Sequence, residues 1–181
     1  KNLIKQIQEE LQSNTSYRLM EFCGGHTHTI FRYGIPDMLP KNIKLMHGPG
    51  CPVCILPMKR INAAIELAQQ PDNVLCSYGD MLRVPGAEQQ SLLKAKSQGA
   101  DVRMIYSPAE AINIAKNEPE KSIIFFAVGF ETTTPPTAVI LEQAVQLKLK
   151  NLYIFCNHVL TPPAIEGIME PAKQANESIL D

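Results

Sequence analysis

Six short apolar segments, separated by turns and mostly by helical stretches, constrain the fold of this 181-residue chain more than any other feature. Most have the length of about 4–8 residues that is typical of buried strands. They cover residues 17–22, 43–46, 74–78, 102–106, 123–128 and 152–156. Parallel strands must be joined by crossovers, which helices usually supply. The sequence therefore predicts an α/β fold, with two Rossmann-like lobes whose mainly parallel sheets are flanked by helices.

Helical start and stop signals lie between most of these segments. Residues 2–12 carry apolar side chains at helical spacing. Further helices are expected over residues 57–69 and 86–98, and Gly99 would be the C-cap of the second. Prolines follow helix-capping residues in Ser107-Pro108-Ala109-Glu110, Thr134-Pro135 and Thr161-Pro162.

Residues 23–41 interrupt this alternation, because glycines and prolines punctuate them. The stretch offers little room for a full crossover helix, so it predicts a functional loop or a short irregular helix. A boundary between lobes is expected near residues 106–108. It would divide a first α/β domain over residues 1–106, with the cysteine motifs, from a second, incomplete α/β domain over residues 107–181.

Composition and charge exclude some classes of function. A net charge of -1 argues against a general binder of nucleic acids or acidic lipids. No apolar run approaches the ~18 residues that span a bilayer, and the N-terminal segment lacks the apolar stretch of a signal peptide. We therefore expect a cytoplasmic protein with no nucleic-acid or membrane partner. In such a chain, five cysteines favour metal, redox or packing roles over a disulfide framework.

The five cysteines divide into two groups by their surroundings. Cys76 and Cys156 lie in apolar, strand-like runs, where a cysteine usually acts as a small hydrophobic residue. The other three lie in two glycine-rich strings, Cys23-Gly24-Gly25-His26-Thr27-His28 and Gly48-Pro49-Gly50-Cys51-Pro52-Val53-Cys54. Each string follows a predicted strand, and ligands of open α/β sheets bind at the carboxyl ends of strands. A sulfur-based site is therefore expected there.

The residue types and spacing of these strings allow several chemistries. Cys51 and Cys54 have the two-residue spacing of a reversible dithiol, and a helix is expected to follow them. The same spacing suits a metal knuckle, and Cys23 with His26 would complete a closed Cys3His zinc site. Cys23 with His26 also fits a nucleophile with an adjacent base.

Other polar residues at strand ends have both structural and functional interpretations. Glu131, in Gly129-Phe130-Glu131-Thr132-Thr133-Thr134, is either a charge that caps a helix or a reactive group at the edge of the sheet. The threonines after it would cap a helix or bind an anion. His28, His47 and His158 are more readily explained as structural residues than as ligands.

The two cysteine strings and the Glu131 string, in this order, resemble the HypD family of hydrogenase maturation factors. The strings Ser77-Tyr78-Gly79-Asp80-Met81-Leu82-Arg83-Val84-Pro85-Gly86 and Asn157-His158 to Pro163 also look familial, so the resemblance covers nearly the whole chain. It implies a cytoplasmic scaffold, rather than a conventional enzyme, on which an iron centre acquires two cyanides and one carbon monoxide. The finished Fe(CN)2CO group is destined for nickel-iron hydrogenase. The implied partners are a HypC-type small chaperone and a HypE-type cyanide donor.

The resemblance also implies roles for individual residues. Cys23 would hold the iron with His26 close by, and Gly24 and Gly25 would let a partner's backbone approach closely. Cys51 and Cys54 would form a dithiol that exchanges electrons with a four-iron, four-sulfur cluster. Glu131 would line the cleft between the two domains.

One departure from the family qualifies this interpretation. Family members are longer and carry the cluster on cysteines of a C-terminal region, whereas no cysteine follows Cys156 here. The chain therefore resembles an N-terminal portion that contains the iron site without the cluster ligands. A thiol-disulfide oxidoreductase and a structural zinc-binding domain are the alternatives.

Overall fold

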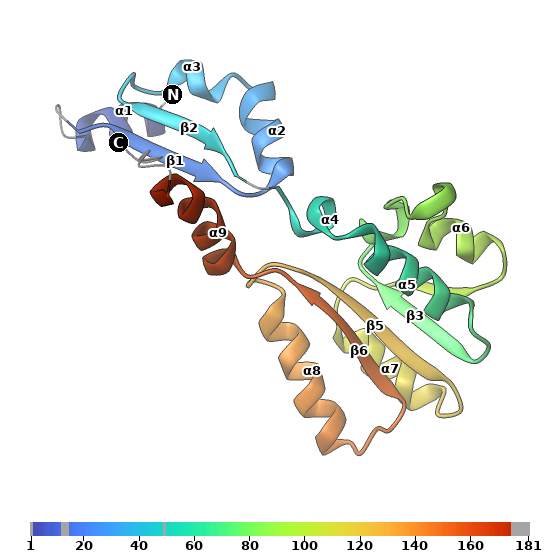
Figure 1. Cartoon of the computed structure of the whole chain (residues 1–181). Coiled ribbons are helices and arrows are strands. Elements are labelled where there is room, and N and C mark those ends of the chain that lie inside the picture. Colours follow the sequence, from blue (N-terminus) through green and yellow to red (C-terminus); the bar gives the residue numbers. More distant parts are fainter. Residues whose placement is uncertain (1, 12–14, 49, 175–181) are drawn as a thin grey trace. The chain divides into compact units, whose positions relative to one another are not determined.

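The computed structural model describes residues 2–11, 15–48 and 50–174, and the chain divides into two compact units (Figure 1). Unit 1 comprises Lys1–Cys54 together with Ala164–Asp181, and unit 2 comprises Ile55–Pro163. Both are α/β, with every recorded strand pair parallel, as predicted. In the described ranges, no helix is both long and apolar enough to cross a membrane.

Unit 1 is built on one parallel strand pair, β1 (Tyr17–Glu21) with β2 (Ile43–His47). The helix expected near the N-terminus is α1 (Asn2–Glu10), and the end of the expected range, Gln12, lies outside the described residues. Glu21 pairs with His47 at the carboxyl end of the sheet, and the Gly48 amide extends the ladder by donating to the Glu21 carbonyl at 2.8 Å. The register therefore places the carboxyl ends of β1 and β2 side by side, and one cysteine string follows each of them.

The crossover between β1 and β2 is helical, which confirms the second of the two expectations for residues 23–41, a short irregular helix. It contains α2 (Gly24–Arg32) and α3 (Ile35–Met38). The helix starts directly after Cys23, and its two glycines occupy the first turn instead of a loop. Gly34, at φ 60°, then breaks the helix in a left-handed conformation that glycine adopts without steric cost.

Unit 2 contains a four-stranded parallel sheet in the order β4-β3-β5-β6. Its strands are β3 (Asn73–Ser77), β4 (Asp101–Met104), β5 (Ser122–Gly129) and β6 (Leu152–His158), and all six predicted strands of the chain are confirmed to within two residues. The chain order reverses between β3 and β5. Sheets of this type place ligand-binding loops at the carboxyl ends of the strands beside such a reversal.

Helices flank this sheet, as parallel strands require for burial of both faces. Helices α5 (Met58–Gln69) and α6 (Leu92–Ser97) contact each other and β4, while α7 (Ala109–Asn117) contacts β5, β6 and α8 (Thr134–Gln146). Alternate residues of β5, Ile123, Phe125 and Ala127, face one core cluster with Val74 and Cys76 of β3. That cluster is completed by α7 and α8.

The expected helix over residues 86–98 is wrong in its first half. Ala87–Gln89 form a 3₁₀ turn, and α6 begins only after Ser91, whose hydroxyl accepts a hydrogen bond from the Lys94 amide at 3.1 Å. The Ala87 amide donates to the Asn62 side chain at 2.8 Å, a tertiary bond that replaces a helical one. Gly99, at φ 105°, follows α6 in the conformation expected of a glycine that ends a helix.

The boundary expected near residues 106–108 falls inside unit 2, because one sheet joins strands from both sides of it. The chain instead passes between units at α4 (Pro52–Ile55) and again in α9 (Thr161–Gln174). Unit 1 therefore consists of two segments that are distant in sequence, which a single linear cut cannot represent.

The two remaining cysteines differ in environment. Cys76 is fully buried in β3, and burial raises the pKa of its thiol to about 12, which fits the predicted role of a small hydrophobic residue. Cys156 in β6 is exposed, so the same prediction is wrong for it. The face of β6 that bears Cys156 is only partly covered, a tertiary property that the apolar run does not reveal.

Candidate thiol and histidine site

Cys23 is the N-cap residue of α2, two positions beyond the end of β1. Its backbone is extended, at φ -81° and ψ 120°, and its side chain makes no capping hydrogen bond. A Cβ atom built on Gly25 would lie 3.7 Å from the Cys23 sulfur, while one on Gly24 would meet nothing within 4 Å. The sulfur therefore lies against the first turn of α2, and open space lies beside it at Gly24.

Glu21, which the sequence motifs did not indicate, links Cys23 to His26. Its Oε1 atom accepts a hydrogen bond from the Cys23 backbone amide at 2.9 Å and lies 3.2 Å from His26 Nδ1. The only sequence signal for it was an acidic residue near the end of a predicted strand, two positions before Cys23. One carboxylate thus holds the backbone of the cysteine and the ring of the histidine together.

Cys51 and Cys54 form a close dithiol around α4. Their sulfur atoms lie 2.7 Å apart, beyond the ~2.05 Å length of a disulfide bond. The Cys54 amide also approaches the Cys51 sulfur at 3.3 Å. Neither thiol is buried, so both are accessible for exchange or ligation.

The pKa of Cys54 is raised, first by its hydrogen bond with the Cys51 side chain and then by partial burial. The charge of Cys23 also contributes to this rise. All three thiols belong to unit 1. The described residues contain no group of three or more Cys, His, Asp or Glu side chains arranged to hold a metal ion, so the closed Cys3His set is not assembled in them.

Glu131 lies in unit 2 and caps a helix. Its carboxylate accepts hydrogen bonds from the Thr161 amide and, at 2.8 Å, from the Thr161 hydroxyl. These bonds lower the pKa of Glu131, and the bond from the Thr161 amide is the largest cause. The acid therefore caps α9 rather than the helix that follows it in sequence. Among the adjacent threonines, Thr133 is the N-cap residue of α8, but its hydroxyl donates backwards to the Phe130 carbonyl at 2.8 Å.

The other histidines have different surroundings. The His47 ring stacks on Phe31 with centroids 4.9 Å apart. His158 lies between two threonine hydroxyls, with Nε2 3.0 Å from Thr137 Oγ1, and burial lowers its pKa. These two support the structural interpretation, whereas His28 is exposed on α2.

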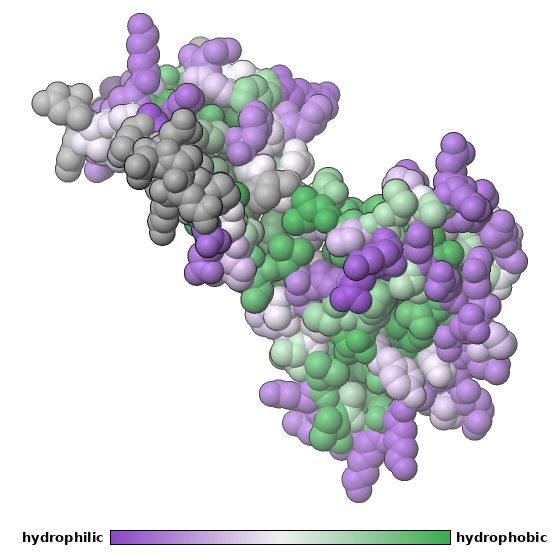
Figure 2. Space-filling view, in the orientation of Figure 1, coloured by the Kyte–Doolittle hydropathy of each residue, from purple (hydrophilic) through white to green (hydrophobic). Residues whose placement is uncertain are grey.

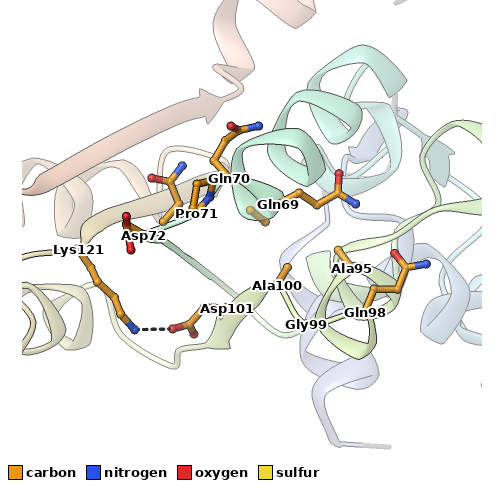
Figure 3. Close-up of a pocket in the computed structure, with 12 residues that line it drawn as sticks. Gln69, Gln70, Pro71, Asp72, Ala95, Gln98, Gly99, Ala100, Asp101 and Lys121 are labelled. Atoms are coloured by element: carbon orange, nitrogen blue, oxygen red, sulfur yellow. Dashed lines mark hydrogen bonds and ion pairs between the residues drawn. The ribbon is translucent and has the colours of Figure 1, made fainter.

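A polar pocket of about 340 Å³ lies at the amino-terminal edge of the unit 2 sheet (Figure 3). Its walls come from the turn after α5, the turn after α6 and the start of β4. The Lys121 ammonium at its rim is paired with Asp101 at 3.2 Å. The pocket lies at the strand edge opposite to Glu131, and none of its lining residues is a cysteine or histidine.

Apolar side chains also reach the surface of unit 2 (Figure 2). On α8, Leu141 and Val145 line a shallow hollow of about 590 Å³. Its only titratable lining group is Glu142, so this surface offers apolar contact rather than chemistry.

The fold and the site define a class: an α/β protein with cysteine, histidine and carboxylate groups gathered where parallel strands end. Such sites bind soft metal ions or exchange electrons with disulfides. The chain belongs to the HypD family, because the family described as "HypD: Hydrogenase formation hypA family" matches residues 1–181.

Individual relatives agree with this assignment. The chain is 57% identical over 182 residues to "Hydrogenase maturation factor HypD" of Azotobacter vinelandii, covering 100% of the chain and 48% of that protein. It is 59% identical over 168 residues to "Hydrogenase maturation factor HypD2" of Bradyrhizobium diazoefficiens, covering 93% and 44%. Against "Hydrogenase maturation factor HypD" of Escherichia coli it is 45% identical over 184 residues, covering 98% and 49%. The chain thus spans about half the length of the curated relatives it matches.

Proposed function

We propose that this chain acts in hydrogenase maturation by holding an iron centre while the centre receives its cyanide and carbon monoxide ligands. The iron group is cargo, passed on after assembly. Cys23 is the anchoring thiolate and His26 the adjacent nitrogen donor. The observation that carries the proposal is the single carboxylate of Glu21 that joins the Cys23 amide to the His26 ring, in the same unit as the close Cys51–Cys54 dithiol.

The donor set suits such cargo. Thiolates and imidazoles are favourable ligands for low-valent iron, and the incoming diatomic ligands complete the coordination, so few protein donors are needed. A site with open positions differs from a closed structural zinc site, which takes all four ligands from the protein. The open space at Gly24 leaves room beside Cys23 for a partner's backbone.

The dithiol supplies reducing equivalents in this proposal. Oxidation of Cys51 and Cys54 to a disulfide releases two electrons and two protons. The electrons pass singly to oxidised four-iron, four-sulfur clusters, in two transfers, and the protons pass to solvent. The reverse reaction takes up two electrons and two protons and restores both thiols. The cluster ligands belong to the C-terminal region that the family resemblance implies.

The partners that fit this function are a small HypC-type chaperone, which shares the iron, and a HypE-type cyanide donor. The relatives named above are called hydrogenase maturation factors, which supports a place among such assembly proteins.

Reconstitution tests the proposal. The protein is purified without oxygen, loaded with iron in the presence of a HypC-type partner and the cyanide donor, and examined by infrared spectroscopy. We expect cyanide and carbonyl stretching bands in the unmodified protein and none after Cys23→Ala. Cys156→Ala, which removes an exposed thiol from β6, is the matched control and should retain the bands. Bands that survive Cys23→Ala would overturn the assignment of the iron ligand.

The 2.7 Å sulfur separation also favours a second function, a general thiol-disulfide oxidoreductase. That function predicts turnover of a generic disulfide substrate, abolished by Cys51→Ala and unaffected by Cys23→Ala. Absence of such turnover in a protein that still forms the infrared bands would leave the maturation scaffold as the function.

A further inference from the structure

The backbone of Glu21 belongs to the parallel strand pair of unit 1. Its carbonyl accepts a hydrogen bond from the Gly48 amide at 2.8 Å, and Glu21 pairs with His47 in the β1–β2 ladder. Its side chain, 34% exposed, lies at the carboxyl end of the sheet. The sheet therefore fixes the backbone from which the carboxylate extends.

By contrast, the ring of His26 depends on few contacts. Its side chain is 71% exposed on the first turn of α2. The contact recorded for its ring in the described part of the chain joins Nδ1 to Glu21 Oε1 at 3.2 Å, and no hydrogen bond to Nε2 is recorded there. Glu21 is therefore the residue that orients the imidazole.

The chemistry of this contact determines which nitrogen carries the proton. An ionised carboxylate can only accept hydrogen bonds, so the nitrogen facing it must donate. In a neutral ring, a proton on Nδ1 leaves the lone pair on Nε2. Histidines that ligate metals commonly donate their other ring N–H to a carboxylate, which fixes the tautomer and increases the basicity of the ligating nitrogen.

We propose that Glu21 is a positioning residue that holds His26 as the Nδ1–H tautomer. The lone pair of Nε2 is then available as a metal ligand beside Cys23. Because the same Oε1 atom accepts the Cys23 amide, one carboxylate sets the backbone of the thiol and the direction of the imidazole together. The identity of the bound metal, iron, rests on the proposed function. The tautomer does not.

A helix-capping role alone does not account for this arrangement. The Cys23 amide needs only one acceptor, and Glu21 could accept its hydrogen bond whatever the orientation of the His26 ring. The contact with Nδ1 adds nothing to the backbone of α2. A purely structural Glu21 thus predicts that the His26 tautomer is insensitive to its removal.

Nuclear magnetic resonance of the iron-free protein labelled with ¹⁵N-histidine tests the proposal. At about pH 8.5, where imidazole is ordinarily neutral, nitrogen shifts distinguish the protonated from the bare ring nitrogen. We expect His26 to carry its proton on Nδ1. A proton on Nε2, or on both nitrogens, would overturn the proposal without any variant.

Variants then assign the effect to the carboxylate. Glu21→Ala should release His26 into a mixture of tautomers and leave exposed His28 unchanged. Glu21→Gln retains an acceptor oxygen and should preserve the Nδ1–H tautomer. Glu142→Ala removes an exposed carboxylate on α8 and is the control. An unchanged His26 tautomer in correctly folded Glu21→Ala would overturn the proposal.

Iron titration separates this inference from the proposed function. Glu21→Ala should weaken Fe(II) binding by about 10–100-fold, the usual effect of losing the carboxylate behind a ligating histidine. If the unmodified protein binds no iron yet shows the Nδ1–H tautomer, the iron function fails and the positioning role of Glu21 stands. If iron binds equally well to both proteins, Glu21 does not act through His26 on the metal.

Discussion

Glu131 and Thr161 are joined by two hydrogen bonds that connect the end of β5 to the start of α9, 30 residues further along the chain. The backbone amide and the hydroxyl of Thr161 both donate to the carboxylate. A negative charge at this position satisfies a free helical N–H group and interacts favourably with the helix dipole. The conspicuous acid of the third motif thus has a structural task in unit 2.

Replacement of Glu131 by alanine should lower the thermal midpoint of the protein, because α9 loses its cap. Since hydrogen bonds to Thr161 lower the pKa of Glu131 below its ordinary value of 4.5, the stabilisation is complete above that value and is lost as the pH falls through the lower, folded pKa. Thermal unfolding followed by circular dichroism from neutral to acidic pH measures this loss. Glu142→Ala should leave the midpoint unchanged, and an unaltered acid limb in Glu131→Ala would contradict the capping role.

An ion cluster in unit 2 predicts a second, separable pH dependence. Arg103 bridges Asp101 and Glu118, with Nη2 2.7 Å from Asp101 and 2.9 Å from Glu118, and Lys121 contacts both acids. Hydrogen bonds from Arg103, then from Lys121, lower the pKa of Glu118 to about 2. The cluster should therefore stabilise the fold above the ordinary pKa of 4.5 and lose this effect as the pH approaches about 2.

Arg103→Met should remove most of that acid dependence. Chemical unfolding at a series of pH values, repeated at high salt, measures it. Salt should diminish the effect in the unmodified protein, because the cluster is partly exposed. Lys148→Met on the same unit is the control, and equal acid sensitivity of both variants would exclude the cluster as its source.

The dithiol predicts an asymmetric reactivity. The hydrogen bond with the Cys51 side chain is the largest cause of the raised pKa of Cys54. Cys51→Ala should therefore lower the pKa of Cys54 and increase its rate of alkylation by iodoacetamide near neutral pH. Mass spectrometry of the peptide that contains Cys54 gives the rate, with exposed Cys156 in the same sample as the reference. A slower reaction in the variant would contradict a hydrogen bond between the Cys51 and Cys54 side chains.

Gly48 and Gly24 should differ in how replacement by alanine affects the stability of the protein. A Cβ on Gly48 would lie 2.9 Å from the Glu21 carbonyl oxygen and 2.9 Å from Phe22 Cα, so the backbone of unit 1 must shift. We expect Gly48→Ala to destabilise the protein by about 1–3 kcal/mol, the usual cost of overpacking. Denaturant unfolding measures this.

Gly24→Ala should leave stability unchanged, because the added Cβ meets nothing within 4 Å. If a partner's backbone approaches Cys23 there, this variant should still reduce complex formation with the HypC-type chaperone, measured by calorimetry. Normal complex formation would show that the open space at Gly24 is not the approach route.

The first cysteine string folds in a way that its glycines alone did not decide. Gly24 and Gly25 allowed either a loop or a short irregular helix, and the structure places both in the first turn of α2. Local glycine content did not decide the outcome, because β1 and β2 are parallel and must be joined by a crossover. The six strands, by contrast, were predictable because each apolar run reflects burial in its sheet.

The candidate site shows the same division. The sequence alone predicted Cys23, His26, Cys51 and Cys54 as candidates, because sulfur and imidazole beside glycines are recognisable as chemistry without coordinates. It also determined the α/β class through the spacing of the apolar segments.

Only the tertiary structure decided what surrounds these groups. It placed Glu21 against His26 and assigned Glu131 to the cap of α9. It also left Cys156 exposed while burying Cys76. Each of these depends on contacts with residues outside the motif, and on which face of an element the fold covers. Sequence periodicity carries the type of a residue and its element, whereas its hydrogen-bond partner and its exposure arise only when distant segments pack.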